Sequence, residues 1–225
     1  MSIRDWPKTE RPRERLLEHG ANALSDGELL AVLIGCGNRG RSAVDLARSL
    51  IDKFGSLREF LSAEPSRCLG ELGIGPARYA SMQAALELAR RHYREPLRSH
   101  GCGFKHPEAV RAFLLAQLRD RPHEVFCCLH LDQRHRLIAF EELFNGSLDT
   151  ASVHIREVVR RLLRHNAAAL ICAHNHPSGV AEPSEADRYL TRRLKDTLAS
   201  IDVRLIDHVI VGGTRCFSFA DRGLL

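Results

Sequence analysis

Hydrophobic residues follow two different spacings along the chain. Up to about residue 95 they recur every three or four positions, which is the spacing of amphipathic helices. This spacing predicts helices at 13–19, 28–34, 43–54, 56–62 and 76–91. From residue 103 onward, short apolar runs alternate with helical segments, a pattern typical of a sheet flanked by helices.

The apolar runs of the second half predict strands and further helices. Strands are expected at 124–132, 137–144, 167–173, 203–211 and 216–219, and helices at 106–118, 153–164 and 185–200. Only a short polar segment separates the first two strands, so they should pair as an antiparallel hairpin. In the helix at 153–164, the apolar residues expected to face inward are Val158, Val159, Leu162 and Leu163.

These patterns predict an α+β fold in two parts. A helical domain is expected at 1–95, and an α/β domain with a mixed sheet flanked by helices at 103–225. Residues 91–101 lose the helical spacing and contain Pro and Gly, so we expect an interdomain linker at 96–102.

The composition is that of an ordinary globular protein. Of the 225 residues, 44% are hydrophobic and 27% are charged. No apolar run approaches the roughly 20 residues that cross a bilayer, and the N-terminus lacks the apolar core of a secretion signal. The seven cysteines are scattered without a Cys-x-x-Cys pair, which is typical of reduced core thiols. We therefore expect a cytoplasmic protein that does not act at a membrane.

A glycine-rich turn at 69–78 is the main nucleic-acid signal of the helical half. Gly73 and Gly75 flank an isoleucine, and Pro76 opens the next helix. This turn resembles the helix-hairpin-helix motif, in which glycines let the backbone approach phosphate and free amides attract it. Arg78 adds a positive charge, and the net charge of +5 permits contact with nucleic acid without requiring it. The N-terminal domain would then contact DNA non-specifically; the alternative is a turn that only joins packed helices.

Metal-binding residue types gather at the end of the strand expected at 167–173. His174 and His176 lie two positions apart, so their imidazoles should share one face of the strand. A turn follows, and Ser184 opens a helix in which Asp187 lies one turn inside. Two nitrogens and one carboxylate oxygen would bind a cation and leave a fourth position open, which is typical of a catalytic zinc site.

Each half of this pattern has an ordinary explanation. A His-x-His pair at a strand end is most often packed or exposed, without a ligand. A Ser-x-x-Asp sequence at a helix start is a capping box, in which the Ser184 hydroxyl accepts from the amide of residue 187. The two halves together, separated by seven residues, are much more specific than either alone.

A zinc-bound water also needs a general base to take its proton. Glu124 opens the first strand of the second half, and Glu157 lies at a helix start. Glu124 has an alternative role as a solvated residue at a strand end, and Glu157 as a complement to the helix dipole. These residue types do not by themselves decide between the two.

The pattern His-x-His, seven residues, Ser-x-x-Asp resembles the JAMM motif of the MPN-plus metalloproteases at every defining position. Other segments are similar to the bacterial RadC-type JAB-domain family; these are 11–17, 24–30, 73–75, 174–179 and 205–208. The likeness covers nearly the whole chain and implies a JAB/MPN-like domain in its second half.

The resemblance implies a zinc-dependent hydrolase of the metallopeptidase or isopeptidase type. The implied Zn²⁺ ligands are His174, His176 and Asp187. Glu124 would be the general base, because family members carry a Glu where this strand begins, and Ser184 would donate a hydrogen bond to the oxyanion.

Other residues receive lesser roles from the same resemblance. Glu157 is kept as a supporting residue, and His208 is expected to be structural because the ligand set is already complete. The residue between the histidines is Asn175, whereas the deubiquitinating branch usually has Ser or Thr there. This argues against a ubiquitin-like substrate and leaves a protein or peptide of unknown identity.

Two other classes of function stay open. In one, the chain is a DNA-binding accessory protein that acts through the helical hairpin, with a structural or vestigial metal site. In the other, a metal-dependent nuclease, the letters His-Asn-His are the only support. We rank the nuclease lowest, because nucleases of that name spread these residues over a ββα unit.

Overall fold

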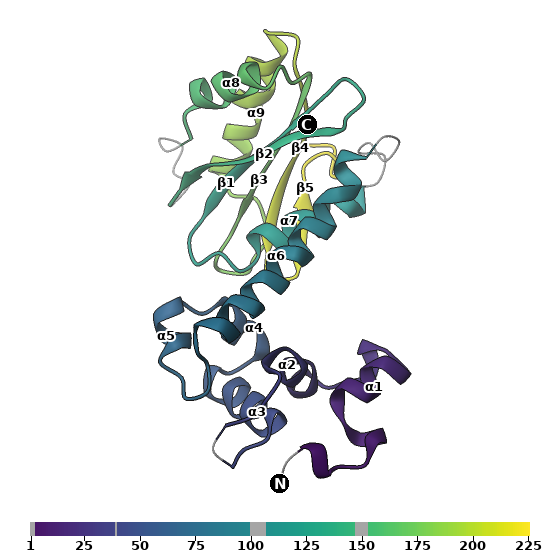
Figure 1. Cartoon of the computed structure of the whole chain (residues 1–225). Helices are drawn as coiled ribbons and strands as arrows, with labels where there is room; N and C mark the ends of the chain where they lie inside the picture. The colour runs from purple at the N-terminus through teal and green to yellow at the C-terminus, as the bar shows by residue number, and fades with distance from the viewer. Residues whose placement is uncertain (1–2, 39, 100–106, 147–152) are drawn as a thin grey trace. The chain divides into compact units, whose positions relative to one another are not determined.

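The computed structural model describes residues 3–38, 40–99, 107–146 and 153–225 (Figure 1). The chain divides into two compact units, Met1–Leu88 and Ala89–Leu225, and the division falls within one long helix. Each unit has its own buried hydrophobic core. Among the described residues, no helix combines the length and the apolar character needed to cross a bilayer.

Helices build the N-terminal unit, as its hydrophobic spacing predicts. They are α1 (Pro12–His19), α2 (Asp26–Ile34), α3 (Ala43–Phe54), α4 (Leu57–Ser62), α5 (Pro65–Leu69) and the start of α6 (Pro76–Arg98), with short 3₁₀ helices at Ile3–Asp5, Lys8–Glu10 and Ala21–Ala23. The spacing does not predict α5, because a helix of five residues is too short to show a period.

Side-chain caps define where these helices begin. Ser42 starts α3 with a capping box: its hydroxyl accepts from the amide of Asp45 at 3.1 Å, and the Asp45 carboxylate accepts from the Ser42 amide at 3.1 Å. Ser25 and Glu28 form the same box at the start of α2. Because each box satisfies amides that the first helical turn leaves free, it places the helix start in the sequence.

Arg78, at the start of α6, braces two loops of the N-terminal unit. Its guanidinium donates to the carbonyl of Cys36 at 2.6 Å and also to the carbonyl of Gly73. The positive charge that the sequence offers to a phosphate therefore already serves the packing of this unit. DNA binding by the N-terminal domain stays a prediction. Arg78 adds no support to it, because its guanidinium already donates to these two carbonyls.

A mixed five-stranded sheet forms the centre of the C-terminal unit. Its strands are β1 (Val125–Leu131), β2 (Leu137–Asn145), β3 (Ala169–Asn175), β4 (Arg204–Gly212) and β5 (Arg215–Ser218), in the order β2-β1-β3-β4-β5. Neighbouring strands are antiparallel except β3 and β4, which are parallel. The predicted hairpin of β1 and β2 and the predicted mixed sheet are confirmed.

Helices cover both faces of this sheet (Figure 1). They are α7 (Pro107–Leu118) on one face and α8 (Ile155–Arg164) and α9 (Glu185–Ala199) on the other. All seven residues of β1 are buried, and alternate residues face opposite helices: Leu129 packs with the α7 core, and Phe126 with the α8 and α9 core. His174 pairs with Phe126 across β1 and β3, so it also faces α8 and α9.

The linker expected at 96–102 is not observed over its described part. Pro96 and Leu97 belong to the last turn of α6, and Leu97 is only 1% exposed. It packs in the same cluster as Phe113 of α7 and Leu129 of β1. Burial of Leu97 explains why the helix continues although Pro96 cannot donate a backbone hydrogen bond. Residues 100–102 lie outside the described residues.

Two other expectations need correction. Leu163 is 62% exposed, whereas Val158 and Leu162, four positions apart, are completely buried, so α8 presents a narrower apolar face than its sequence predicts. The cysteines are not all core thiols, because Cys36 is exposed and Cys216 half-buried. Cys102 lies outside the described residues.

The narrow face of α8 makes a matched pair of substitutions informative. Leu162→Ala removes a fully buried side chain and should lower the free energy of unfolding of the C-terminal unit by about 2–5 kcal/mol. Leu163→Ala, one residue away and exposed, should change it by no more than about 0.5 kcal/mol. Urea titration of both variants measures the difference, and equal losses would show that α8 is placed wrongly on the sheet.

Candidate metal centre

The start of α9 fixes the position of Asp187. The Ser184 hydroxyl donates to Asp187 Oδ2 at 2.6 Å, the Ser184 amide donates to the same oxygen at 2.8 Å, and the Asp187 amide donates back to the hydroxyl at 3.2 Å. The predicted capping box is therefore present. Asp187 is 3% exposed, so its carboxylate is held inside the domain next to the end of β3.

The structure brings the three predicted ligands together. His174 Nε2 lies 3.0 Å from His176 Nε2 and 3.2 Å from Asp187 Oδ1, and His176 Nε2 lies 3.6 Å from Asp187 Oδ2. Ligands about 2.0–2.1 Å from a tetrahedral zinc lie about 3.3 Å from one another. The spacing of these atoms therefore fits a single small cation.

A chain of hydrogen bonds determines which nitrogen of His174 carries its proton. The Thr191 hydroxyl donates to the carbonyl of Asp187 at 2.6 Å, so its oxygen must accept from His208 Nδ1 at 2.6 Å. His208 Nε2 then has a free lone pair and accepts from His174 Nδ1 at 2.9 Å. We therefore assign His174 as a neutral ring with its proton on Nδ1. Its unprotonated Nε2 faces the other ligands.

The ring of His176 is oriented by the backbone. Its Nδ1 lies 2.8 Å from the carbonyl of Val180, which can only accept, so Nδ1 carries the proton and Nε2 is free. Gly212, at the end of β4, lets this loop approach: a Cβ there would lie only 2.4 Å from the amide nitrogen of Ala181. The close approach places the Val180 carbonyl beside the ligand that it orients.

With both rings in these neutral forms, the two Nε2 lone pairs and the Asp187 carboxylate face one another. The pKa of Asp187 is raised by burial alone, but His174, His176 and the Ser184 hydroxyl outweigh burial and hold it well below its usual range. Burial and the neighbouring His174 lower the pKa of His208, so this ring stays neutral. Neutral imidazoles with an ionised carboxylate are the donor set that divalent transition metals bind.

Asn175 connects the ligands to the segment that carries Glu124. Its side-chain oxygen accepts from the amide of Val125 at 2.8 Å, and its nitrogen donates to the carbonyl of His123 at 3.0 Å. Glu124 lies between these two residues and is half-buried. The pKa of His176 is raised first by Asp187, and the charge of Glu124 adds a smaller increase.

The two other sequence candidates have different surroundings. Glu157 forms ion pairs with Arg160 at 2.6 Å and Arg161 at 2.8 Å on its own helix, which lower its pKa. In the structure Glu157 therefore pairs with arginines of α8, and among the described residues no ion pair or hydrogen bond connects it to the histidines that it was expected to support. The hydroxyl proton of Ser184 is directed at Asp187, and its role toward an oxyanion stays a prediction.

Sequence reasoning did not find the residues that orient the ligands. His208 was expected to be structural, but its bond to His174 was not foreseen. Asn175 was treated only as a departure from other family members. Thr191 was not named, although it lies four residues after Asp187 and therefore on the same face of α9. That spacing is the one signal that would have identified Thr191.

Comparison with known protein families gives a match in each half of the chain. The model of the RadC-like JAB domain matches residues 104–224, which is more than half of the chain. A second model, UPF0758 N-terminal, matches residues 3–80. The two matches cover both parts of the predicted fold.

Full-length relatives give the same result. The UPF0758 protein of Thioalkalivibrio sulfidiphilus is 59% identical over 225 residues, which is 100% of both chains. The UPF0758 proteins of Stutzerimonas stutzeri and Ectopseudomonas mendocina are 58% and 59% identical over 223 residues, with 99% of each chain covered. Because its second half matches the RadC-like JAB domain and its relatives match over the whole chain, the chain belongs to the RadC family of UPF0758 proteins.

Proposed function

We propose that this protein is a zinc-dependent hydrolase that cleaves peptide or isopeptide bonds. Membership of a JAB-domain family supports the broad class of hydrolase. The observation that carries the proposal is that the Nε2 lone pairs of His174 and His176 face one carboxylate, while hydrogen bonds hold the proton of each ring on Nδ1. A divalent cation satisfies all three groups at once.

In the proposed mechanism, His174, His176 and Asp187 hold the ion and the remaining residues handle the proton. Bound zinc would supply a Lewis acid that activates water and polarises the scissile carbonyl. Glu124 takes the proton from the attacking water and delivers it to the leaving amine. Asn175 keeps Glu124 in reach by bonding to the residues on both sides of it.

Ser184 is the proposed donor to the developing oxyanion. Its hydroxyl now bonds to Asp187 Oδ2, and an Asp187 carboxylate that binds a metal has less charge to offer that bond. The hydroxyl is then available to a negatively charged oxygen next to the site. A donor in this position commonly contributes roughly 10²-fold or more to the rate.

The proposed substrate is a protein or peptide. The rim of the site is accessible: the His176 side chain is 17% exposed, and Val180 on the loop beside it is 54% exposed. We place the protein in the cytoplasm, where the thiols of Cys68, Cys127 and the other cysteines would stay reduced. Contact with DNA stays a separate prediction, and a steep dependence of duplex binding on salt concentration is its expected signature.

The first prediction concerns the ligands themselves. His174→Ala combined with His176→Ala should cost the purified full-length chain one equivalent of zinc, because Asp187 alone cannot hold the ion. Mass spectrometry of metal content after dialysis measures this loss. The control replaces two exposed histidines, His19 and His92, by Ala and should keep the zinc content of the unmodified chain. An unchanged zinc content in the first variant would refute the assignment.

The second prediction separates metal binding from catalysis at Glu124. Glu124→Gln keeps the shape of the side chain but cannot accept a proton, so zinc should stay bound while turnover falls by roughly 10²–10⁴-fold. Turnover is measured by mass spectrometry of the fragments released from a defined peptide mixture. Glu108→Gln, an exposed position on α7, is the matched control. Full activity in Glu124→Gln would remove this residue from the mechanism.

The third prediction tests the hydrogen-bond chain behind His174. Thr191→Val keeps the volume but removes the hydroxyl that orients His208, so zinc affinity should fall by about 10–100-fold. Competition with a zinc chelator gives the affinity. Thr197→Val on the same helix is the control and should leave it unchanged. If both variants bind zinc as tightly as the unmodified chain, the proton of His174 is not controlled through Thr191.

A further inference from the structure

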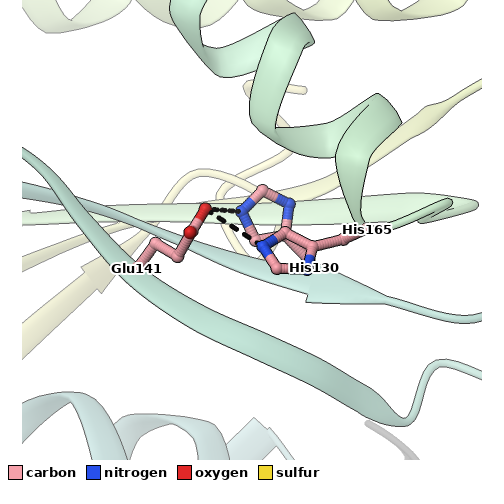
Figure 2. A group of neighbouring side chains, drawn as sticks. All are labelled: His130, Glu141 and His165. Atoms are coloured by element: carbon pink, nitrogen blue, oxygen red, sulfur yellow. Dashed lines mark ion pairs between the residues drawn. The ribbon is translucent and has the colours of Figure 1, made fainter.

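A second group of metal-binding side chains lies on the same face of the sheet. It consists of His130 on β1, Glu141 on β2 and His165, the residue that follows α8 (Figure 2). Figure 2 shows the Glu141 carboxylate directed at both imidazole rings. One atom of each side chain lies within 4.8 Å of the others. None of the three contributes to the site at His174.

The register of the sheet separates this group from the first. His130 pairs with Leu170 of β3, whereas His174 pairs with Phe126 of β1. Phe126 and His130 are four residues apart on β1, which is about 13 Å at roughly 3.3 Å per residue. The two groups therefore lie at opposite ends of β1 and β3, too far apart to share one ion.

The distances within the group match a coordination sphere. Glu141 Oε2 lies 3.2 Å from His130 Nε2 and 3.2 Å from His165 Nε2. Ligands of a tetrahedral zinc lie about 3.3 Å from one another. The other carboxylate oxygen, Oε1, lies 3.4 Å from Arg161 Nη1, so Arg161 leaves Oε2 to the histidines.

Among the described residues these facing atoms form ion-pair contacts with one another but no aligned hydrogen bond. Both ring nitrogens of His130, Oε2 of Glu141 and Nε2 of His165 are buried without an aligned hydrogen bond. His130 is completely buried, and such polar groups are normally hydrogen-bonded in proteins. The short contacts at 3.2 Å without hydrogen-bond geometry indicate atoms arranged around a shared ligand.

The charges also favour a cation. Glu141 brings a carboxylate to two imidazole rings, a donor set that divalent transition metals bind. His165 follows the last turn of α8, where the carbonyl ends of the helix attract positive charge.

We propose that His130, Glu141 and His165 form a second site for a divalent transition metal such as Zn²⁺ or Co²⁺. The site has three protein ligands, and water takes the fourth position. Entry is from the side of His165 and Glu141, whose side chains are 23% and 22% exposed. The ion connects β1, β2 and the end of α8, so its effect is to hold this helix against the sheet.

The test counts the ions that the full-length chain binds. Metal is removed with a chelator, Co²⁺ is added, loosely held ions are dialysed away, and the bound ions are measured by mass spectrometry. The unmodified chain should bind two ions, and Glu141→Gln combined with His165→Gln should bind one. His130 is left unchanged because its ring is part of the buried core. His19→Gln with His92→Gln is the matched control and should bind two.

Removing the first site separates the two proposals. With His174→Ala and His176→Ala, the chain should bind one ion, and adding Glu141→Gln and His165→Gln should leave none. If the first site binds no metal, the unmodified chain binds one ion that only the Glu141 and His165 changes remove. If those two changes never lower the number of bound ions, the second site is refuted, whatever the first site does.

Thermal unfolding gives an independent measurement. In the variant without the first site, Co²⁺ should raise the melting temperature of the C-terminal unit, because an ion that binds the folded state stabilises it. Glu141→Gln alone keeps the size of the side chain and should abolish this rise. A rise of the same size in the presence of Glu141→Gln contradicts the proposal.

Discussion

The proposed metal centre depends on the hydrogen bonds that hold the ring protons of His174 and His176 on Nδ1, away from the facing Nε2 atoms. The Val180 carbonyl holds the proton of His176 on Nδ1, and His208 does the same for His174. Each bond leaves a lone pair on Nε2, and the two lone pairs meet the Asp187 carboxylate. With both rings neutral, this arrangement matches the donor set of the proposed metal site.

The architecture supplies each part of this arrangement from a different element. The antiparallel pairing of β1 with β3 brings the segment of Glu124 beside the histidines, and Asn175 bonds it there. The parallel neighbour β4 contributes His208 and ends at Gly212, where the loop after His176 comes close. The start of α9 supplies Asp187 through its capping box. A buried sheet with helices on both faces thus holds the ligands more rigidly than loops alone would.

Sequence patterns predicted the parts of this molecule that rest on local spacing. The strands and the hairpin follow from short apolar runs. The meeting of His174, His176 and Asp187 follows from the interval between His176 and Ser184. Residues whose role depends on tertiary contacts were missed. Leu97 extends α6 because it packs against α7, and Leu163 is exposed because α8 lies on a narrow strip of the sheet. His130 and Glu141 meet only through the register of β1 and β2, which no local pattern specifies.

The most direct measurement is the anomalous diffraction of crystals of the full-length chain grown with zinc, recorded at the zinc absorption edge. We predict a peak about 2.0–2.1 Å from Nε2 of both His174 and His176, and at a similar distance from a carboxylate oxygen of Asp187. Nδ1 of each ring should keep its bond to His208 or Val180. A zinc-replete crystal without a peak between these three side chains, or with the ion on Nδ1 of either ring, would contradict the proposed metal centre.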